Sequence, residues 1–349
     1  MHMADALLSP SVGLAMWAAS AATIAYSSAR LRRELDDRKV PLMGVLGAFL
    51  FAAQMINFSI PATGSSGHLG GGLLLAILLG PYAAFLTIAS VLVVQALFFA
   101  DGGLLALGCN IFNIGFFPAF VVFPFFYSRL IGLNPNRFRM TTVTMLSALL
   151  GLQLGSLAVV LETVASNISA LPFSSFLLMM QPIHLAIGAV EGMVTVAVVT
   201  FLHKARPEIL QGALQASPIG NRPGRKVALA FLIGALLTGG VFSWFSSRDP
   251  DGLEWAVARV AGSTELQAPP LQLHSTLARL QEKFAILPDY HFGKAAEGGA
   301  PAGPADVKTQ EIINPGTSVA GIAGTLLTLL LVFLCGFVLK RRNQTAWRP

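Results

Sequence analysis

Long apolar runs dominate the pattern of hydrophobic and polar positions along the sequence. They lie near 10–29, 41–58, 72–80, 82–99, 104–131, 141–166, 176–203, 227–246 and 318–339. A bilayer core about 30 Å thick needs roughly 20 apolar residues per helix, so most of these runs predict membrane-spanning helices. The run 72–80 is too short to cross alone, because Pro81 ends it, and we expect other helices to surround it.

Composition supports the same fold class. Hydrophobic residues make up 54% of the 349 residues and charged residues only 11%, whereas soluble domains carry roughly 25% charged residues. Asp101 is the sole charged residue between positions 40 and 128. The pattern therefore predicts an all-α integral membrane protein, with the lipid bilayer as its surroundings.

The net charge of +6 does not indicate a nucleic-acid partner, because the basic residues cluster beside the apolar runs. The segments 30–39, 129–139, 204–226 and 340–349 hold 17 of the 23 Lys and Arg residues. Basic residues accumulate on the cytoplasmic side of membrane proteins. If all nine runs count as spans, this distribution predicts an outer N-terminus and a cytoplasmic C-terminus.

The sequence divides into two units. Residues 1–204 predict a bundle of seven spans, and the polar residues 205–225, with three prolines, predict a cytoplasmic linker. Residues 226–349 predict an accessory unit with helices at about 227–246 and 318–339. Between these helices lies an outer segment, 247–317, that we expect to be loosely ordered because it is rich in Gly, Ala and Pro.

The start of the chain is a candidate metal chelate. His2 is too large for the initiator methionine to be removed before it, so we expect Met1 to keep a free amine. The Met1 amine, the His2 backbone nitrogen and the His2 imidazole can close two fused rings on one ion. Nitrogen donors in a plane suit Ni²⁺ or Cu²⁺. The simpler alternative is that His2 belongs to a frayed end.

A fourth nitrogen would complete the plane, and His68 is the best candidate. It lies in a Gly/Ser-rich stretch, 63–72, which is expected on the same outer face as Met1. His203 is expected at the cytoplasmic interface, whereas His274 and His291 are expected to be solvated on the surface of the accessory unit.

Several polar residues lie inside apolar runs, where ionisable groups are candidates for function. His184 and Glu191 are seven residues apart and share one helix face, which suits a packing hydrogen bond or a supporting role beside a site. Asn110 and Asn113 could orient the loops that carry His2 and His68, since metal-bound imidazoles donate their other N–H to a fixed acceptor. Asp101 is expected in a turn between helices.

The first helix carries pairs of small residues four positions apart, among them Ala15 with Ala19 and Ala18 with Ala22. Such a ridge favours close helix contact, either within the bundle or with a coupling membrane subunit. The chain has no Walker A sequence, so ATP hydrolysis by that route is excluded for it.

Four segments together resemble the NikM/CbiM family, the substrate-capture components of energy-coupling-factor transporters for nickel and cobalt. They are Met1-His2, the stretch 64–69 with its Gly-His-Leu end, residues 101–110 and residues 184–192. The resemblance covers residues 1–204. Residues Pro250, Asp251, Gly252, Leu253 and Glu254 resemble the signature of the NikN-type accessory component, and a fused NikMN arrangement describes the whole chain.

This resemblance implies a seven-helix capture bundle joined to a two-helix accessory unit in the bacterial cytoplasmic membrane. It implies a site made by the Met1 amine, the His2 backbone nitrogen and the imidazoles of His2 and His68. Ni²⁺ or Co²⁺ would be the transported substrate. The chain would be a transporter subunit rather than an enzyme, and the ATPases and a coupling membrane subunit would be separate chains.

Two alternatives stay open. Cobalt is the alternative substrate, although a square plane of nitrogens favours nickel. The alternative mechanism is an ATP-independent channel or carrier in which Asp101, Glu162 and Glu191 line a path.

Overall fold

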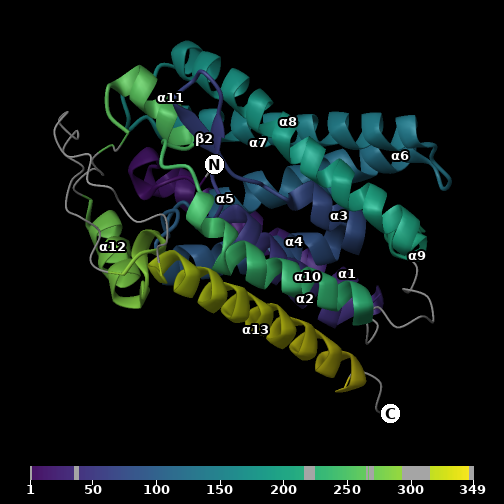
Figure 1. Cartoon of the computed structure of the whole chain (residues 1–349). Coiled ribbons are helices and arrows are strands. Elements are labelled where there is room, and N and C mark those ends of the chain that lie inside the picture. The colour runs from purple at the N-terminus through teal and green to yellow at the C-terminus, as the bar shows by residue number, and fades with distance from the viewer. Residues whose placement is uncertain are drawn as a thin grey trace.

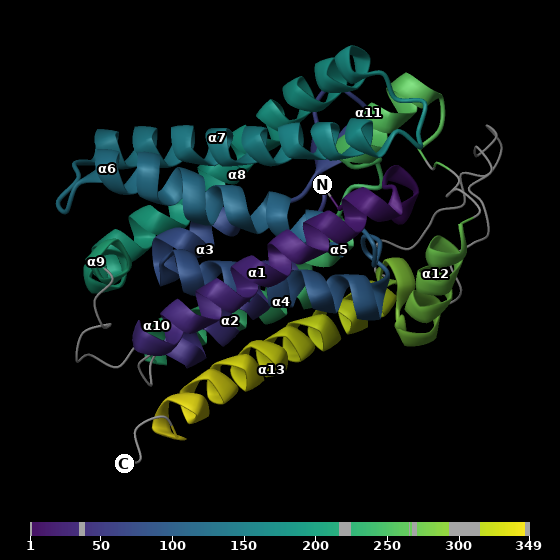
Figure 2. The same cartoon turned by 180° about the vertical axis from the view of Figure 1, so that it is seen from behind.

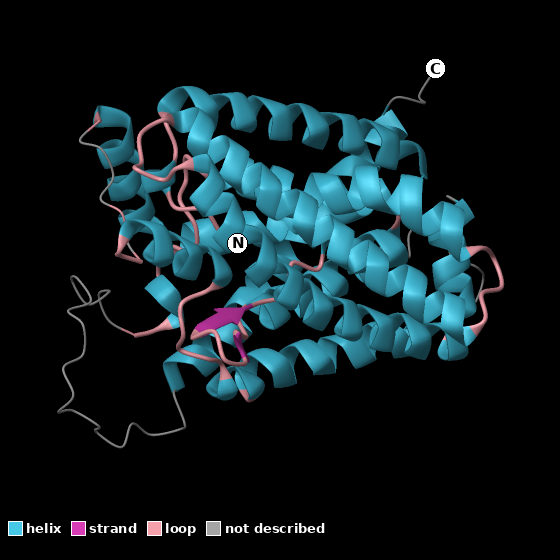
Figure 3. Cartoon of the chain, turned by 90° about the horizontal axis from the view of Figure 1, so that it is seen from above, coloured by secondary structure: helices cyan, strands magenta, loops and turns pink. Residues whose placement is uncertain are grey.

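The computed structural model describes residues 2–34, 39–215, 225–264, 266, 271–292 and 315–345. These residues confirm the all-α class: long helices lie side by side and one small β-hairpin sits at their end (Figures 1 and 3). The longer helices are α1 (Pro10–Glu34), α2 (Lys39–Gln54), α4 (Pro81–Phe99), α7 (Arg137–Ser166), α8 (Phe173–Ala205), α10 (Arg225–Gly240) and α13 (Pro315–Thr345).

Shorter elements connect these helices. They are η1 (Asp5–Leu7), α3 (Gly72–Leu79), α5 (Leu107–Ile111), η2 (Phe112–Tyr127), α6 (Ser128–Ile131), α9 (Pro207–Gln215), η3 (Phe242–Phe245), α11 (Gly252–Ala261), α12 (Gln272–Phe284) and η4 (Pro288–Tyr290). The hairpin pairs β1 (Phe58–Ile60) with β2 (Ser65–Gly67) in antiparallel register, with Ser59 opposite Ser66.

Five segments of the described chain are long and apolar enough to cross a membrane: Pro81–Phe99, Leu107–Ile131, Arg137–Ser166, Phe173–Ala205 and Pro315–Lys340. The helix Lys39–Gln54 is apolar but shorter. The protein is therefore a multi-pass membrane protein, whereas the count of nine spans stays a prediction.

The short run 72–80 forms α3, which is buried along its whole length. Eight residues of α-helix reach about 12 Å, far less than a bilayer core. Gly80 ends the helix at a φ of 79° and Pro81 opens α4. Neighbouring helices therefore enclose a partial helix, as the sequence predicts.

The run 104–131 is less regular than expected. Its central part, η2, is a π-helix that contains Pro118 and Pro124. Proline has no N–H to donate and its ring disturbs the preceding turn, so an ordinary α-helical bond pattern is interrupted here.

Two expectations about irregular segments need correction. Residues 205–225 were expected to be a polar linker, but α9 occupies its first half and buries Ile209 and Leu210 against the bundle. The outer segment 247–317 was expected to be loosely ordered, yet it contains α11 and α12, which contact α8 and α4. Residues 216–224 and 293–314 lie outside the described residues.

The accessory helices pack directly on the bundle. Both α10 and α13 contact α2, and α13 also contacts α4 (Figure 2). Between α10 and α13, a Cβ on Gly321 would lie 2.2 Å from the carbonyl oxygen of Gly239, so glycine is required for this close approach. The two units therefore share an extensive interface.

The two ends of the helix bundle differ. The hairpin, α11 and α12 gather at one end, whereas α6 and α9 lie at the other (Figure 1). The basic clusters of α6 and of the end of α8 belong to the second end. Among the described residues, Asp101 and Asp251, which face His2 and His68, belong to the first.

Candidate metal site

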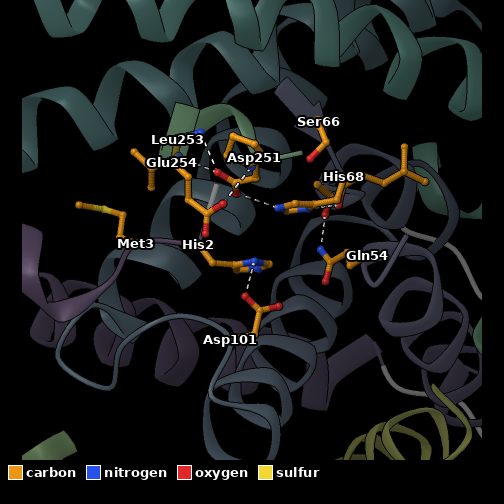
Figure 4. Close-up of polar contacts among 12 residues, drawn as sticks. His2, Met3, Gln54, Ser66, His68, Asp101, Asp251, Leu253 and Glu254 are labelled. Carbon is orange, nitrogen blue, oxygen red and sulfur yellow. Dashed lines mark hydrogen bonds and ion pairs between the residues drawn. The ribbon is translucent and has the colours of Figure 1, made fainter. Parts of the chain in front are cut away.

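Two histidines from distant parts of the sequence meet at the hairpin end. The rings of His2 and His68 are stacked, with centroids 4.8 Å apart and planes inclined by 3° (Figure 4). His68 is buried, and the Nε2 atom of His2 is buried without a hydrogen-bond partner among the described residues. The site therefore presents imidazole nitrogens in a sheltered position.

The residues after His2 are tied to the bundle. Asn110 accepts a hydrogen bond from the Met3 N–H (2.8 Å) and donates one to the Met3 carbonyl (3.2 Å). Gly103 N–H donates to the same carbonyl at 2.9 Å. Asp5 accepts from the Ala106 N–H at 2.9 Å. These contacts fix the backbone beside His2, which is the orienting role predicted for Asn110.

The loop that carries His68 is held from two other helices. Glu191 of α8 accepts one hydrogen bond from the Gly70 N–H (2.8 Å) and another from the Gly71 N–H (3.0 Å). Gln54 at the end of α2 donates to the Gly70 carbonyl at 2.9 Å. Glu191 thus supports the His68 loop, whereas nothing in the sequence singled out Gln54.

Asp101 faces the His2 ring from below in Figure 4. Its Oδ1 atom lies 3.1 Å from His2 Nδ1, and its Oδ2 atom accepts a hydrogen bond from the Tyr290 hydroxyl at 2.5 Å. The sequence placed Asp101 in a turn and attached no role to Tyr290. Both belong to the surroundings of the site.

Each residue of the accessory motif, 250–254, makes a specific contact at this end of the bundle. Asp251 caps α11 by accepting from the Leu253 and Glu254 N–H groups, and Glu254 returns a bond to the Asp251 N–H. Leu253 is buried. A Cβ on Gly252 would lie 2.7 Å from the end of the Ile187 side chain, so Ile187 of α8 would have to shift to admit a larger residue. The Pro250 carbonyl accepts a hydrogen bond from the Ser66 N–H at 2.8 Å.

This motif also brings Asp251 to the site. Asp251 Oδ2 lies 3.8 Å from His68 Nε2, and the backbone at Asp251 forms a parallel bridge with Ser66 of β2. Trp255 donates to the Thr63 carbonyl at 3.0 Å in the hairpin turn. The accessory unit therefore covers the His68 loop.

Burial affects the protonation of the His68 ring and of the carboxylates around it. Burial lowers the pKa of His68 to about 3, so this imidazole is neutral at physiological pH. Burial alone would raise the pKa of Asp101, but the adjacent His2 ring outweighs it and holds the pKa below its usual range. Burial and the neighbouring Asp251 raise the pKa of Glu254 to about 7.

A cavity of about 900 Å³ opens beside the stacked rings. The bundle contributes His2, His68 and Asp101 to its wall, and the accessory unit contributes Asp251 and Tyr290. Both histidines therefore border a cavity that the bundle and the accessory unit line together.

The remaining predicted polar residues lie deeper. Asn113 donates to Glu162 at 2.7 Å and contacts the Met3 sulfur at 3.9 Å, so it touches the N-terminal segment but not the His68 loop. His184 Nδ1 donates to the Met180 carbonyl of its own helix at 2.8 Å. His184 Nε2 is buried without a partner, near Gly252. This bond lies within α8, so it is not a bond between helices, and both roles expected for His184 stay predictions.

Met1 lies outside the described residues. Among residues that are described, no three His, Cys, Asp or Glu side chains form a group that could hold a metal ion. The two imidazoles are the nitrogen donors that the structure brings together.

Two further predictions concern His274 and the alanine ridge on α1. His274 was expected to be solvated, but it is buried and its Nε2 donates to the Leu8 carbonyl at 2.9 Å, which anchors α12 near the start of the chain. On α1, Ala15 and Ala22 are exposed and Ala19 is half-buried, so this ridge does not pack inside the chain.

Models of two known protein families match the two units of this chain. The family model described as "Cobalt uptake substrate-specific transmembrane region" (CbiM) matches residues 2–209, and the PDGLE domain matches residues 225–341. The chain belongs to the CbiM family. It carries a PDGLE domain in the same polypeptide, as the resemblance to a fused NikMN arrangement predicts.

Known relatives match either most of the chain or only part of it. The chain is 31% identical to a "Putative fused nickel transport protein NikMN" of Archaeoglobus fulgidus, over 99% of this chain and 100% of that protein. It is 31% identical to the "Fused nickel transport protein NikMN" of Rhodobacter capsulatus, over 83% of this chain and 88% of that protein. The "Cobalt transport protein CbiM" of Sorangium cellulosum is 33% identical over 60% of this chain and 94% of its own length.

A solved structure is also similar. The crystal structure of a truncated transition metal transporter has a TM-score of 0.52 and 30% identity, and the match covers 59% of this chain and 99% of that one. This chain is thus a transporter-family membrane protein rather than an enzyme.

Proposed function

We propose that this chain captures Ni²⁺ at the outer face of the bacterial cytoplasmic membrane, as the substrate-binding component of an energy-coupling-factor transporter. The ligands would be the Met1 amine, the His2 backbone nitrogen and the imidazoles of His2 and His68. The observation that carries this proposal is the stacking of the His2 and His68 rings, 4.8 Å apart, in a buried position. The names of the relatives, which are nickel and cobalt transport proteins, agree with it.

Chelation requires His2 to bind the ion through one particular ring nitrogen. A six-membered ring that includes the His2 backbone nitrogen closes through Nδ1, and this atom faces Asp101 in the structure. Loading therefore requires the His2 ring to turn and exchange Asp101 for the ion at Nδ1.

Nickel is favoured over cobalt by the donor set. A deprotonated amide nitrogen is a strong-field donor, and four nitrogens in one plane suit Ni²⁺, whereas Co²⁺ accepts higher coordination numbers more readily. Cobalt remains the alternative substrate, and a direct comparison of the two ions decides between them.

Transport would use separate subunits. The exposed ridge of Ala15, Ala19 and Ala22 on α1 suits docking against a coupling membrane subunit, which partner ATPases would drive. The loaded bundle would then reorient and release the ion to the cytoplasm. In the alternative channel mechanism, Asp101, Glu162 and Glu191 would line a path, but each carboxylate accepts hydrogen bonds from neighbouring groups of the fold.

Nickel titration of the purified full chain tests this proposal. One extra residue before Met1 moves the amine away from its chelate position, so we expect the affinity to fall at least about 100-fold. His68→Ala should have a similar effect, whereas His203→Ala at the far end of α8 is the matched control and should leave the affinity unchanged. Unchanged affinity in the extended chain contradicts the amine ligand, and tighter binding of Co²⁺ than Ni²⁺ identifies cobalt as the substrate.

A further inference from the structure

A histidine inside α8 has a ring nitrogen that the fold does not use. His184 is 1% exposed, and its Nδ1 donates a hydrogen bond to the Met180 carbonyl at 2.8 Å. Because Nδ1 carries the proton, Nε2 of the neutral ring carries a lone pair. This Nε2 atom is buried without a hydrogen-bond partner among the described residues. Buried polar groups are normally paired, and ionisable residues in membrane helices are candidates for function, so this nitrogen is a candidate ligand.

The His184 ring borders a small cavity that also reaches His68. The cavity measures about 10 Å³, which is about the space of one water molecule, and lies between the His68 loop and α8. Gly67 and Gly252 form other parts of its wall. One enclosed space therefore joins a histidine of the proposed capture site with a histidine of the bundle interior.

The two rings carry their protons in the same way. The Nδ1 atom of His68 donates to the Leu69 carbonyl at 3.2 Å, just as Nδ1 of His184 donates to Met180. A histidine that binds a metal through one nitrogen generally donates its other N–H to a carbonyl or carboxylate. His184 therefore has the same preparation for a metal ion at Nε2 as His68 has.

Gly252 of the accessory motif leaves this nitrogen uncovered. A Cβ on Gly252 would lie 3.2 Å from His184 Cε1 and 3.4 Å from His184 Nε2. It would also lie 2.7 Å from the end of the Ile187 side chain, which borders the same cavity. A larger residue at position 252 would thus narrow the space in front of Nε2.

A second cavity of about 10 Å³ continues into the bundle. Asn113 and Glu191 border it, and Asn113 Oδ1 is another buried acceptor without a partner among the described residues. The two cavities share three wall residues, Gly70, Ile114 and Leu152. The space that begins at His68 is therefore followed by further donor atoms deeper in the molecule.

We infer that His68 and His184 form an inner site for the transported divalent ion. The ion keeps His68 as a ligand and exchanges the nitrogens of the chain start for His184 Nε2 when it leaves the capture site. This inference rests on the proposed function, because the ion that moves inward is the one captured by the chain start. Two imidazoles hold an ion less tightly than a four-nitrogen chelate, which suits a site that passes the ion on.

Conservative variants isolate the inner site. His184→Asn keeps an N–H₂ group that can donate to the Met180 carbonyl and removes the Nε2 lone pair. His203→Asn, at the far end of α8, is its matched control. Gly252→Ala narrows the cavity, whereas Gly234→Ala is a control in which the added Cβ makes an ordinary contact of 3.7 Å with Phe49.

The first experiment uses the full chain with His2→Gln, which removes the imidazole of the outer chelate and keeps a large second residue, so that Met1 stays in place. X-ray absorption at the nickel edge, at millimolar Ni²⁺, then counts the imidazole neighbours of the bound ion. We expect two imidazoles in this chain and in its His203→Asn and Gly234→Ala derivatives. Addition of His184→Asn or Gly252→Ala should remove the second imidazole.

The second experiment uses the native start and separates capture from passage. His184→Asn should keep the nickel affinity and the thermal unfolding midpoint of the unsubstituted protein, yet lower nickel uptake by cells that make the whole transporter. Uptake equal to that of the unsubstituted protein overturns the inference. A structural role for His184 would instead lower the unfolding midpoint together with the affinity, and this result also overturns it.

The remaining outcomes distinguish this inference from the proposed function. If the His2→Gln chain binds no nickel, the cavity takes water only, and if two imidazoles remain after His184→Asn, the second ring is another histidine. Either result ends the inference, while the proposed function stands as long as extension before Met1 abolishes tight binding. If that extension has no effect, the proposed function fails, and the inner site fails with it.

Discussion

His2 and His68 meet because several unrelated side chains hold their backbones. Asn110 binds both polar groups of the Met3 backbone, and Glu191 binds the two N–H groups that follow the His68 loop. The sequence singled out both histidines as candidate ligands and Asn110 and Glu191 as candidate supporting residues, with a packing bond left open for Glu191. It did not identify Tyr290, because a tyrosine in an outer segment has no local pattern that links it to Asp101, 189 residues away.

The protonation of His68 leads to a prediction about pH. Because burial lowers the pKa of His68 to about 3, this ring loses no proton when the metal binds above that pH. Protons then come from the Met1 amine and the His2 backbone amide, so nickel affinity should rise about tenfold per pH unit for each proton released. Titrations between about pH 6 and pH 8 measure this slope. His68→Ala should bind more weakly with the same slope, and an affinity independent of pH contradicts the backbone ligands.

At the scale of elements, local signals were sufficient where proline or glycine ends a helix. Gly80 and Pro81 predicted the short α3, and the structure encloses it as expected. Packing between elements that are distant in the sequence could not be predicted from such local signals. The α9 segment appears as a polar linker because its buried face consists of few residues, such as Ile209 and Leu210, whose partners lie on other helices.

Glu191 connects α8 with the start of α3, and its substitution tests this connection. In Glu191→Gln one acceptor oxygen becomes an N–H₂ donor that faces a backbone N–H, so one of the two bonds to Gly70 and Gly71 is lost. An unsatisfied buried group costs about 1–3 kcal/mol, and we expect a lower thermal unfolding midpoint together with weaker nickel binding. Glu282→Gln on the exposed side of α12 should change neither. Wild-type stability and affinity in Glu191→Gln contradict this role.

At the scale of the whole molecule, the candidate metal site and the accessory helices α11 and α12 occupy one end of the bundle, and the basic segments around α6 and α9 occupy the other (Figure 1). The composition and the basic clusters predicted this division before any contact was known. They did not predict that the PDGLE unit covers the site, since the bond between Ser66 and Pro250 joins positions 184 residues apart.

The proposed orientation is testable by labelling. In a background without Cys109 and Cys335, single cysteines replace Ser275 on α12 and Arg137 at the start of α7, both exposed. A membrane-impermeant maleimide should label Ser275→Cys in intact cells and Arg137→Cys only after permeabilisation. The reverse pattern contradicts an outer N-terminus.

The central claim is that the beginning of this chain and His68 together hold one ion through nitrogen atoms. X-ray absorption at the nickel edge, on the loaded protein with its native start, tests it most directly. The account predicts a square-planar ion with four nitrogen neighbours and the scattering of two imidazoles, one of which disappears in His68→Ala. A six-coordinate spectrum with oxygen neighbours, unchanged by His68→Ala, would contradict the account.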